Sequence, residues 1–163
     1  MHARTFLGKR AAAVVMTAIV GFGLTSCALP NTSVQGPSDP YTSGLWQALN
    51  RDRGANRLAG LTWSPKLANT ASNWAHQMAN ANTLYHQNLS ALISSPDYAG
   101  YYTLGENILV GPGSMTPDSM EAAWMASAPH RANILSGAFN IVGIGYFRGP
   151  DGRIWAVQDF GGI

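Results

Sequence analysis

The chain has 163 residues, of which 46% are hydrophobic and 11% charged, and its formal net charge is +2. This length suits one domain with a sizeable core. Because there is only one cysteine, no disulfide can form within the chain, and the fold has to be stabilised by core packing.

The first 27 residues are typical of a targeting segment. Arg4, Lys9 and Arg10 form a positive region, and residues 11–24 are an uncharged apolar run that is short for a bilayer span. Leu24-Thr25-Ser26-Cys27 follows and resembles the lipobox of bacterial lipoproteins, in which the cysteine is lipidated and becomes the N-terminus. An uncleaved anchor or an ordinary signal peptide are the alternatives. We predict a signal peptide at 1–27, a lipid on Cys27 and a location on the extracytoplasmic face of the cell membrane.

Removal of the signal peptide reverses the sign of the net charge. Seven basic residues then stand against eight acidic ones, a net charge of about −1. No Lys- or Arg-rich stripe is left, which argues against nucleic acid as a partner. Residues 28–40 are rich in Pro and Ser and lack periodicity, as flexible tethers do. The folded domain is therefore expected at 41–163.

Apolar periodicity predicts three main helices. The first covers 42–53, with Gly54 as its stop. The second begins at Ser64, which can cap it, and Pro65 suits its first position. The third begins at Thr116, and a short helix is expected near 90–94. The second helix has an apolar stripe at helical spacing, formed by Leu67, Ala71, Trp74, Ala75 and Met78.

The remaining apolar runs predict strands. Residues 104–110 form one, and 139–147 and 154–157 form a hairpin around the turn signal Gly-Pro-Asp-Gly at 149–152. This order of elements predicts an α+β fold, an α-β-α sandwich in which helices cover a small antiparallel sheet.

Two polar residues interrupt these apolar segments. Glu106 has apolar neighbours on both sides, and a buried charge is costly unless it is paired or used. Pro129 is expected to end the third helix near Ala128, which would leave His130 just after the break and outside the helical hydrogen bonds. We expect Glu106 and His130 to face one cleft, whereas His86, in a polar loop, carries little information by itself.

Four motifs follow one another between residues 45 and 161: His86 before Gly105-Glu106-Asn107-Ile108, then Trp124-x-x-Ser127-x-x-His130-Arg131-x-Asn133-Ile134-Leu135, then Val142-Gly143-Ile144-Gly145-Tyr146, then Trp155-x-x-Gln158-x-Phe160-Gly161. The ordered set resembles the CAP superfamily (cysteine-rich secretory proteins, antigen 5 and pathogenesis-related 1; SCP-like domains) in its bacterial, disulfide-free form.

The resemblance implies a cleft of two histidines and two acidic residues that can hold a divalent metal. His86, Glu106 and His130 match three of these positions. Ser127 stands in the cleft where other members have a glutamate, and Glu121 points away from that helix face. We therefore expect weak binding of Zn²⁺ or another divalent metal, with water completing the shell. A hydrogen-bonded cluster without metal is the alternative.

The function expected from these features is a non-enzymatic binding module at the cell envelope. No Ser-His-acid arrangement stands out, and a lipidated Cys27 would not be a nucleophile. The resemblance implies a lipid or sterol-like ligand, or a cell-envelope ligand, beside the cleft. The alternative is a metal-assisted hydrolase or peptidase in which Glu106 acts as the base. The sequence gives no indication of the oligomeric state.

Overall fold

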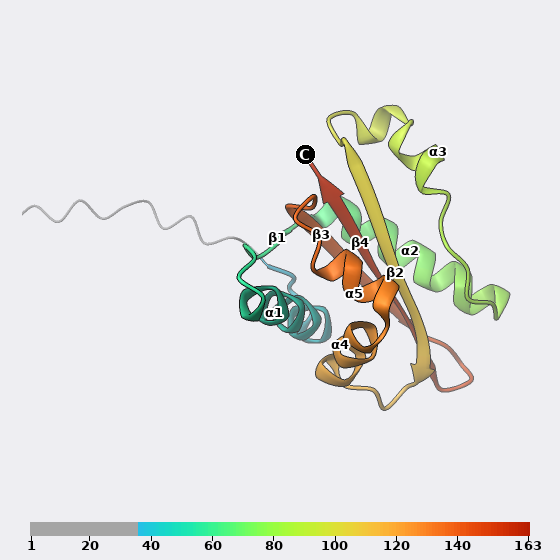
Figure 1. The fold of residues 1–163 in the computed structure, drawn as a ribbon. Coiled ribbons are helices and arrows are strands. Elements are labelled where there is room, and N and C mark those ends of the chain that lie inside the picture. The colour runs from blue at the N-terminus through green and yellow to red at the C-terminus, as the bar shows by residue number, and fades with distance from the viewer. Residues whose placement is uncertain (1–35) are drawn as a thin grey trace, which may run out of the picture. The chain divides into compact units, whose positions relative to one another are not determined.

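The computed structural model describes residues 36–163 (Figure 1). The predicted signal peptide, Cys27 and most of the predicted tether lie outside this range. None of the helices in the described part is long and apolar enough to cross a membrane. The elements in chain order are α1 (Pro40–Ala55), β1 (Thr62–Trp63), α2 (Pro65–Ala81), α3 (Leu89–Ile93), the 3₁₀ turn η1 (Pro96–Tyr98), β2 (Thr103–Pro112), α4 (Pro117–Ala126), α5 (Ala128–Ile134), β3 (Ile141–Arg148) and β4 (Arg153–Gly162).

The four strands form one mixed sheet in the order β1-β3-β4-β2. The hairpin partners β3 and β4 are antiparallel, and β2 adds to the other side of β4, also antiparallel. The two-residue strand β1 pairs parallel to β3, which the sequence did not indicate. Helix α2 packs on one face, while α1 and α4 pack on the other. The predicted α+β class is confirmed.

Side chains that alternate along the strands build a core on each face. The larger core lies under α1 and α4 and includes the fully buried Trp124. The smaller one lies under α2, where the predicted stripe contributes Ala71, Ala75 and Met78. Two glycines of β3 allow α2 to lie very close to the strand, because a Cβ on Gly143 would come within 2.0 Å of a backbone nitrogen of α2.

The starts of the helices follow their capping residues. Ser64 and Thr116 cap α2 and α4, as predicted. Helix α1 begins two residues earlier than expected, because the carboxylate of Asp39 accepts from the backbone N–H of Thr42 at 2.8 Å. Its end also differs from the prediction, since the helix continues past Gly54 to Ala55.

The predicted position of His130 is wrong in one respect. Helix α4 ends at Ala126, but a second helix, α5, begins at Ala128, and His130 lies inside it. Proline has no backbone N–H, and a residue in the first turn of a helix does not need one. Pro129 therefore opens a new helix after the break at Ser127, instead of leaving His130 in irregular backbone.

The outer edge of β2 is covered by side chains from α4 and α5. Trp124 Nε1 donates to the carbonyl of Ile108 at 3.3 Å, and Asn133 Nδ2 donates to the carbonyl of Glu106 at 3.1 Å. Uncovered edge carbonyls would be open to pairing with another chain. These two bonds occupy two of the outward carbonyls of β2 and hold α4 and α5 against this strand.

Candidate functional site

The candidate site is centred on Glu106, whose carboxylate is fully engaged by hydrogen bonds. Glu106 is 4% exposed. Its Oε1 accepts from His86 Nδ1 at 2.6 Å and from the backbone N–H of Gln87 at 3.0 Å. Its Oε2 accepts from Gln87 Nε2 at 2.7 Å. Three donors compensate the buried charge, so Glu106 ties the loop between α2 and α3 to strand β2.

A second buried carboxyl group, Asp159, lies beside Glu106. The two residues are paired across β2 and β4, and Gln87 Nε2 also donates to the oxygens of Asp159 at 3.0 and 3.1 Å. Burial raises the pKa of Asp159 well above its usual range, and the charge of Glu106 raises it further, against the lowering effect of the Gln87 bond. Burial and the adjacent carboxylate therefore both favour the protonated form of Asp159.

The hydrogen bond to Glu106 decides how His86 presents its ring. A carboxylate oxygen can only accept, so His86 Nδ1 carries the hydrogen and Nε2 is the ring nitrogen left for other partners. The His86 side chain is 59% exposed. A carboxylate that orients a histidine through one nitrogen supports metal binding or proton transfer at the other nitrogen.

His130 approaches this group from α5 without bonding to Glu106. Its backbone carbonyl accepts from Asn107 Nδ2 at 3.1 Å, which anchors α5 to β2. Burial lowers the pKa of His130, and the nearby His86 lowers it further. The structure therefore brings the two imidazoles into one neighbourhood, with only His86 in contact with Glu106.

Ser127 and Glu121 do not supply the fourth group of the cleft. Ser127 lies between α4 and α5, and within residues 36–163 its side chain makes no hydrogen bond to the Glu106 cluster. Glu121 is 1% exposed and points into the opposite face of the sheet, where its Oε2 accepts from Gln158 Nε2 at 2.6 Å.

Glu121 belongs to a second buried polar network. Asn107 Nδ2 donates to Gln158 Oε1 at 3.0 Å, and Asn133 Nδ2 donates to Asn107 Oδ1 at 2.9 Å. Burial is the main cause that raises the pKa of Glu121, to about 8. Its Oε1 is buried and has no hydrogen-bond partner among the described residues. The network joins α4 to α5 through the sheet.

The sequence interpretation did not predict the network roles of three buried polar residues: Gln87, Asp159 and Gln158, the last of which appeared only as part of a family motif. A signal was present for two of them, because Gln158-Asp159 interrupts an apolar strand in the same way as Glu106 does. Gln87 carried no such signal. It stands in a polar loop and becomes important only when the loop folds over β2.

The donor set does not fit the expected three-residue metal site. Both oxygens of Glu106 accept hydrogen bonds, two at Oε1 and one at Oε2, so a metal would have to share the carboxylate with His86 and Gln87. Within residues 36–163, no group of three or more His, Cys, Asp or Glu side chains is arranged to hold a metal ion. Two imidazoles remain as protein donors, with Glu106 as the residue that orients one of them.

Comparison with known proteins identifies the family of the chain. The model of the cysteine-rich secretory protein family, CAP, matches residues 46–160. The chain belongs to the CAP family. A curated relative, the uncharacterized protein YkwD of Bacillus subtilis, is 31% identical over 144 residues, which are 80% of this chain and 52% of YkwD. The chain thus spans about half the length of that relative.

Two solved structures share the fold. An extracellular protein with an SCP domain from Bacillus anthracis has a TM-score of 0.59 at 23% identity, and the match covers 79% of this chain and 45% of that one. NaASP2, solved with Zn²⁺, has a TM-score of 0.52 at 12% identity, with coverages of 77% and 83%. At these identities the likeness concerns the fold.

Proposed function

We propose that this CAP protein is a lipid-anchored binding module outside the cytoplasmic membrane, and that its ligand is an apolar envelope molecule such as a lipid or sterol. The observation that carries the proposal is a hollow of about 240 Å³ between α3 and the start of β2. It is lined by Leu89, Ser90, Ile93, Tyr102, Thr103 and Leu104.

The residues around this hollow leave apolar surface in water. Helix α3 buries none of its five residues, although Leu89, Leu92 and Ile93 are among them. Tyr102, at the mouth, is 65% exposed and is held in place by its hydroxyl, which donates to the carbonyl of Ala138 at 3.0 Å. A ligand that covers this surface gains hydrophobic free energy on binding. It does not lose free energy by ordering the Tyr102 ring, because the hydrogen bond already holds that ring.

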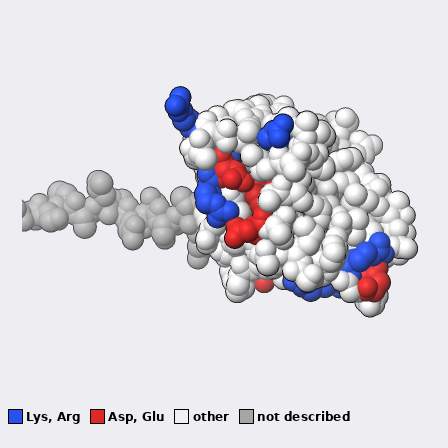
Figure 2. Space-filling model, turned by 60° about the horizontal axis from the view of Figure 1, so that its bottom comes forward, with Lys and Arg blue, Asp and Glu red and all other residues white. Residues whose placement is uncertain are grey.

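The hollow lies directly beside the cleft, because β2 continues from Leu104 to Glu106. The hydrogen bonds of Glu106 to His86 and Gln87 hold the loop that leads into α3. In this proposal the polar cluster is structural support for the wall of the ligand site. In Figure 2 the acidic and basic side chains of this face lie in mixed groups, and no broad area is formed by Lys and Arg alone, which supports the proposal that nucleic acid is not a partner.

The extracytoplasmic location rests on two supports. The residues before Cys27 resemble a lipobox, and the Bacillus anthracis relative with the same fold is an extracellular protein. One acyl chain binds membranes only marginally, so stable anchoring requires more than one chain on the lipidated cysteine.

A hydrolase or peptidase is the second candidate, and one observation favours it. His86 is exposed and is oriented by Glu106 in the way that suits a general base. NaASP2, which shares the fold, was solved with Zn²⁺. Here a metal would bind through the two imidazoles alone, and it would supply Lewis-acid chemistry beside them.

Binding of cis-parinaric acid, a fluorescent fatty acid, tests the proposal. Leu89→Asp places a charge in the hollow at the first position of α3, where an acidic residue does not harm the helix. We expect it to weaken binding at least about tenfold. Ala91→Asp, on the exposed side of the same helix, is the matched control and should bind like the wild type. If Leu89→Asp binds the fatty acid with the same affinity as the wild type, the hollow is not the binding site. If the wild type hydrolyses a peptide substrate and His86→Ala does not, the second candidate is favoured.

A further inference from the structure

We propose that Glu121 is a positioning residue of the cleft that contains His86 and His130. Glu121 points away from the cleft, and it acts through a chain of side-chain amides, named here the amide relay, which leads from α4 through the sheet to α5. The amides are those of Gln158, Asn107 and Asn133. On the cleft side the relay ends on the backbone carbonyls of His130 and Glu106.

The cleft end of the relay fixes the orientation of Asn107. A backbone carbonyl can only accept a hydrogen bond, and a side-chain amide has two hydrogens on its nitrogen and one acceptor oxygen. Asn107 Nδ2 donates to the carbonyl of His130 at 3.1 Å and to Gln158 Oε1 at 3.0 Å. Its Oδ1 accepts from Asn133 Nδ2 at 2.9 Å. Rotation of this amide would therefore break all three hydrogen bonds.

Gln158 extends this orientation to Glu121. Because its Oε1 faces Asn107, its Nε2 faces α4 and donates to Glu121 Oε2 at 2.6 Å. Gln158 and Asn107 are 0% exposed and Glu121 is 1% exposed, so bulk water does not reach the relay to replace a lost partner. A buried N–H without an acceptor is costly. The relay in this orientation therefore needs an acceptor at position 121.

Loss of that acceptor affects the other end of the relay. Oε1 and Nε2 of Gln158 belong to one rigid amide group, so a rotation that finds Nε2 a new partner also moves Oε1 away from Asn107. Asn107 then keeps fewer of the bonds that fix its orientation, and its bond to His130 weakens. Buried side-chain networks couple distant members in this way, beyond their pairwise contacts.

His130 depends on the relay more than His86 does. Glu106 holds the ring of His86 directly, at 2.6 Å. For His130 the structure has, within residues 36–163, a hydrogen bond to the backbone carbonyl and none to the ring. The donor of that bond is Asn107, whereas the end of α5 is held separately from α1. Glu121 therefore acts on the histidine that Glu106 does not contact.

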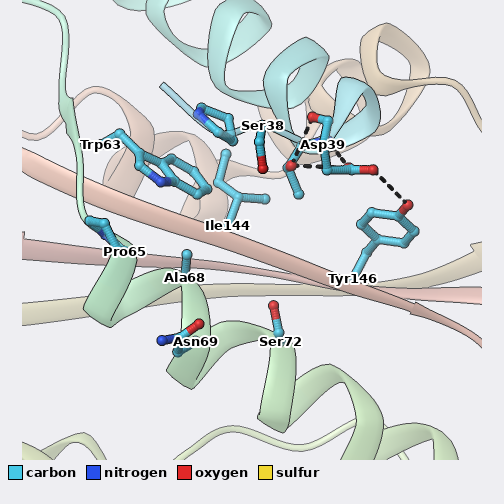
Figure 3. Close-up of a pocket in the computed structure, with 11 residues that line it drawn as sticks. Ser38, Asp39, Trp63, Pro65, Ala68, Asn69, Ser72, Ile144 and Tyr146 are labelled. Atoms are coloured by element: carbon cyan, nitrogen blue, oxygen red, sulfur yellow. Dashed lines mark hydrogen bonds between the residues drawn. The ribbon is translucent and has the colours of Figure 1, made fainter. Parts of the chain in front are cut away.

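The relay is separate from the hollow at α3 and from a second hollow between α1 and α2. Figure 3 shows the second one, of about 290 Å³, and neither Glu121 nor an amide of the relay lines it. The hollow at α3 is also lined by other residues. Failure of this proposal would leave the proposed lipid function unaffected, and failure of the lipid function would leave the relay unaffected.

NMR spectroscopy of the ¹³C,¹⁵N-labelled chain tests the proposal through two signals, the backbone carbonyl resonance of His130 and the exchange rate of the side-chain N–H hydrogens of Asn107. Glu121→Leu removes the acceptor and keeps an apolar group of similar size, so the variant should fold. We expect the His130 carbonyl resonance to move upfield, because the carbonyl loses hydrogen bonding. The Asn107 hydrogens should exchange at least about tenfold faster.

Three further variants separate the relay from general packing. Glu121→Gln keeps an acceptor oxygen for Gln158 and should leave both signals as in the wild type. Met120→Leu, at a buried apolar residue of the same helix, is the matched control and should do the same. Gln158→Leu breaks the relay in its middle and should reproduce the changes of Glu121→Leu. The double variant Glu121→Leu/Gln158→Leu should then show no further change.

The proposal is overturned if Glu121→Leu leaves the signals of His130 and Asn107 as in the wild type. It is also overturned if Glu121→Gln changes them as much as Glu121→Leu does, or if the two substitutions of the double variant act additively, because Glu121 would then act by packing alone. Glu121→Met replaces the leucine variant if that one does not fold. If neither folds while Glu121→Gln does, Glu121 is required for folding and the proposal is overturned.

Discussion

At the scale of single residues, burial controls the protonation of the acidic groups inside the sheet. Asp159 and Glu121 lie on opposite faces, and burial raises the pKa of both. Each accepts a hydrogen bond from a glutamine, Gln87 or Gln158, which serves an acid in either protonation state. Glutamine is therefore well suited to link these carboxyl groups to the network.

Glu121→Gln should change how stability depends on pH. The folded-state pKa of Glu121, about 8, is above the ordinary value of 4.5. Its contribution to stability is then fully present below pH 4.5 and is lost as the pH rises through 8. The amide keeps an acceptor for Gln158 and cannot ionise. We expect similar stability to wild type near pH 5 and a gain of roughly 1–3 kcal/mol at pH 8.

Urea unfolding of wild type and Glu121→Gln across this pH range provides the measurement. Glu121→Ala serves as a control, because it removes both the charge and the bond to Gln158 and should destabilise at every pH. Parallel pH profiles of wild type and Glu121→Gln would show that Glu121 is not protonated by burial.

Zinc binding by the two histidines should be weak and pH-dependent. His86→Ala and His130→Ala should each remove most of the binding measured by titration calorimetry, since only two imidazoles are placed as donors. Glu106→Gln should weaken it about tenfold or more, because loss of the orienting carboxylate has that effect in metal sites. Affinity should fall as the pH is lowered, because a protonated imidazole cannot bind the metal; burial lowers the pKa of His130, so this residue keeps its neutral form below the ordinary range of histidine. His76→Ala, on the exposed side of α2, should change nothing.

The zinc expectation fails if the His86→Ala/His130→Ala double variant binds zinc as well as the wild type. In that case the metal lies elsewhere on the protein, and the Glu106 cluster is a purely structural group.

At the scale of elements, the end of α1 contains a residue in an unfavourable conformation. Arg57 has φ of 61°, its N–H donates to Gly54, and the next N–H, of Leu58, donates to Arg53. This is a Schellman motif, in which glycine is the preferred residue at the left-handed position. Arg57 is exposed and makes no side-chain hydrogen bond within the described residues.

Arg57→Gly should therefore stabilise the protein by about 0.5–1 kcal/mol, because it relieves the contact of Cβ with the backbone. Denaturant unfolding would show a higher midpoint with an unchanged slope. Arg57→Ala keeps the Cβ and should give no such gain. A loss of stability in Arg57→Gly would mean that the arginine side chain has a role that outweighs the strain.

The sequence predicted elements well where the signal is local. Ser64 and Thr116 correctly predicted the starts of two helices, and the Gly-Pro-Asp-Gly turn correctly predicted the hairpin. The parallel pairing of β1 was not predictable, since two residues carry no periodicity. His130 was misplaced because Pro129 can either end a helix or begin one, and the choice depends on how α5 packs against β2.

The candidate site could also be predicted only where the sequence signal is local. Glu106 was recognisable from its apolar neighbours, and its pairing with His86 followed from the family resemblance. The engagement of its second oxygen was not predictable, because it depends on a loop residue, Gln87, whose partners lie 19 and 72 positions away. That contact engages Oε2 of Glu106, a residue that the resemblance places among the metal ligands.

At the scale of the whole molecule, the location depends on Cys27. Cys27→Ala removes the residue that accepts the lipid. The apolar run at 11–24 should not anchor the protein as stably as a cysteine that carries more than one acyl chain. We expect cell fractionation to show loss of the mature membrane-anchored form, with an unprocessed precursor in its place. Leu84→Ala, at an exposed site of the folded domain, is the control. An unmodified Cys27 thiol in the mature wild-type protein would contradict lipid anchoring.

The central claim is that an apolar envelope molecule occupies the hollow between α3 and β2. A native mass spectrum tests it most directly, recorded on residues 36–163, which contain both cores, after incubation with a membrane lipid extract and without chelator. We predict one added mass of lipid size on the wild type and on Ala91→Asp, and its loss in Leu89→Asp. The claim would be contradicted if the wild type showed only the mass of the protein without lipid, or if Leu89→Asp carried as much lipid as the wild type.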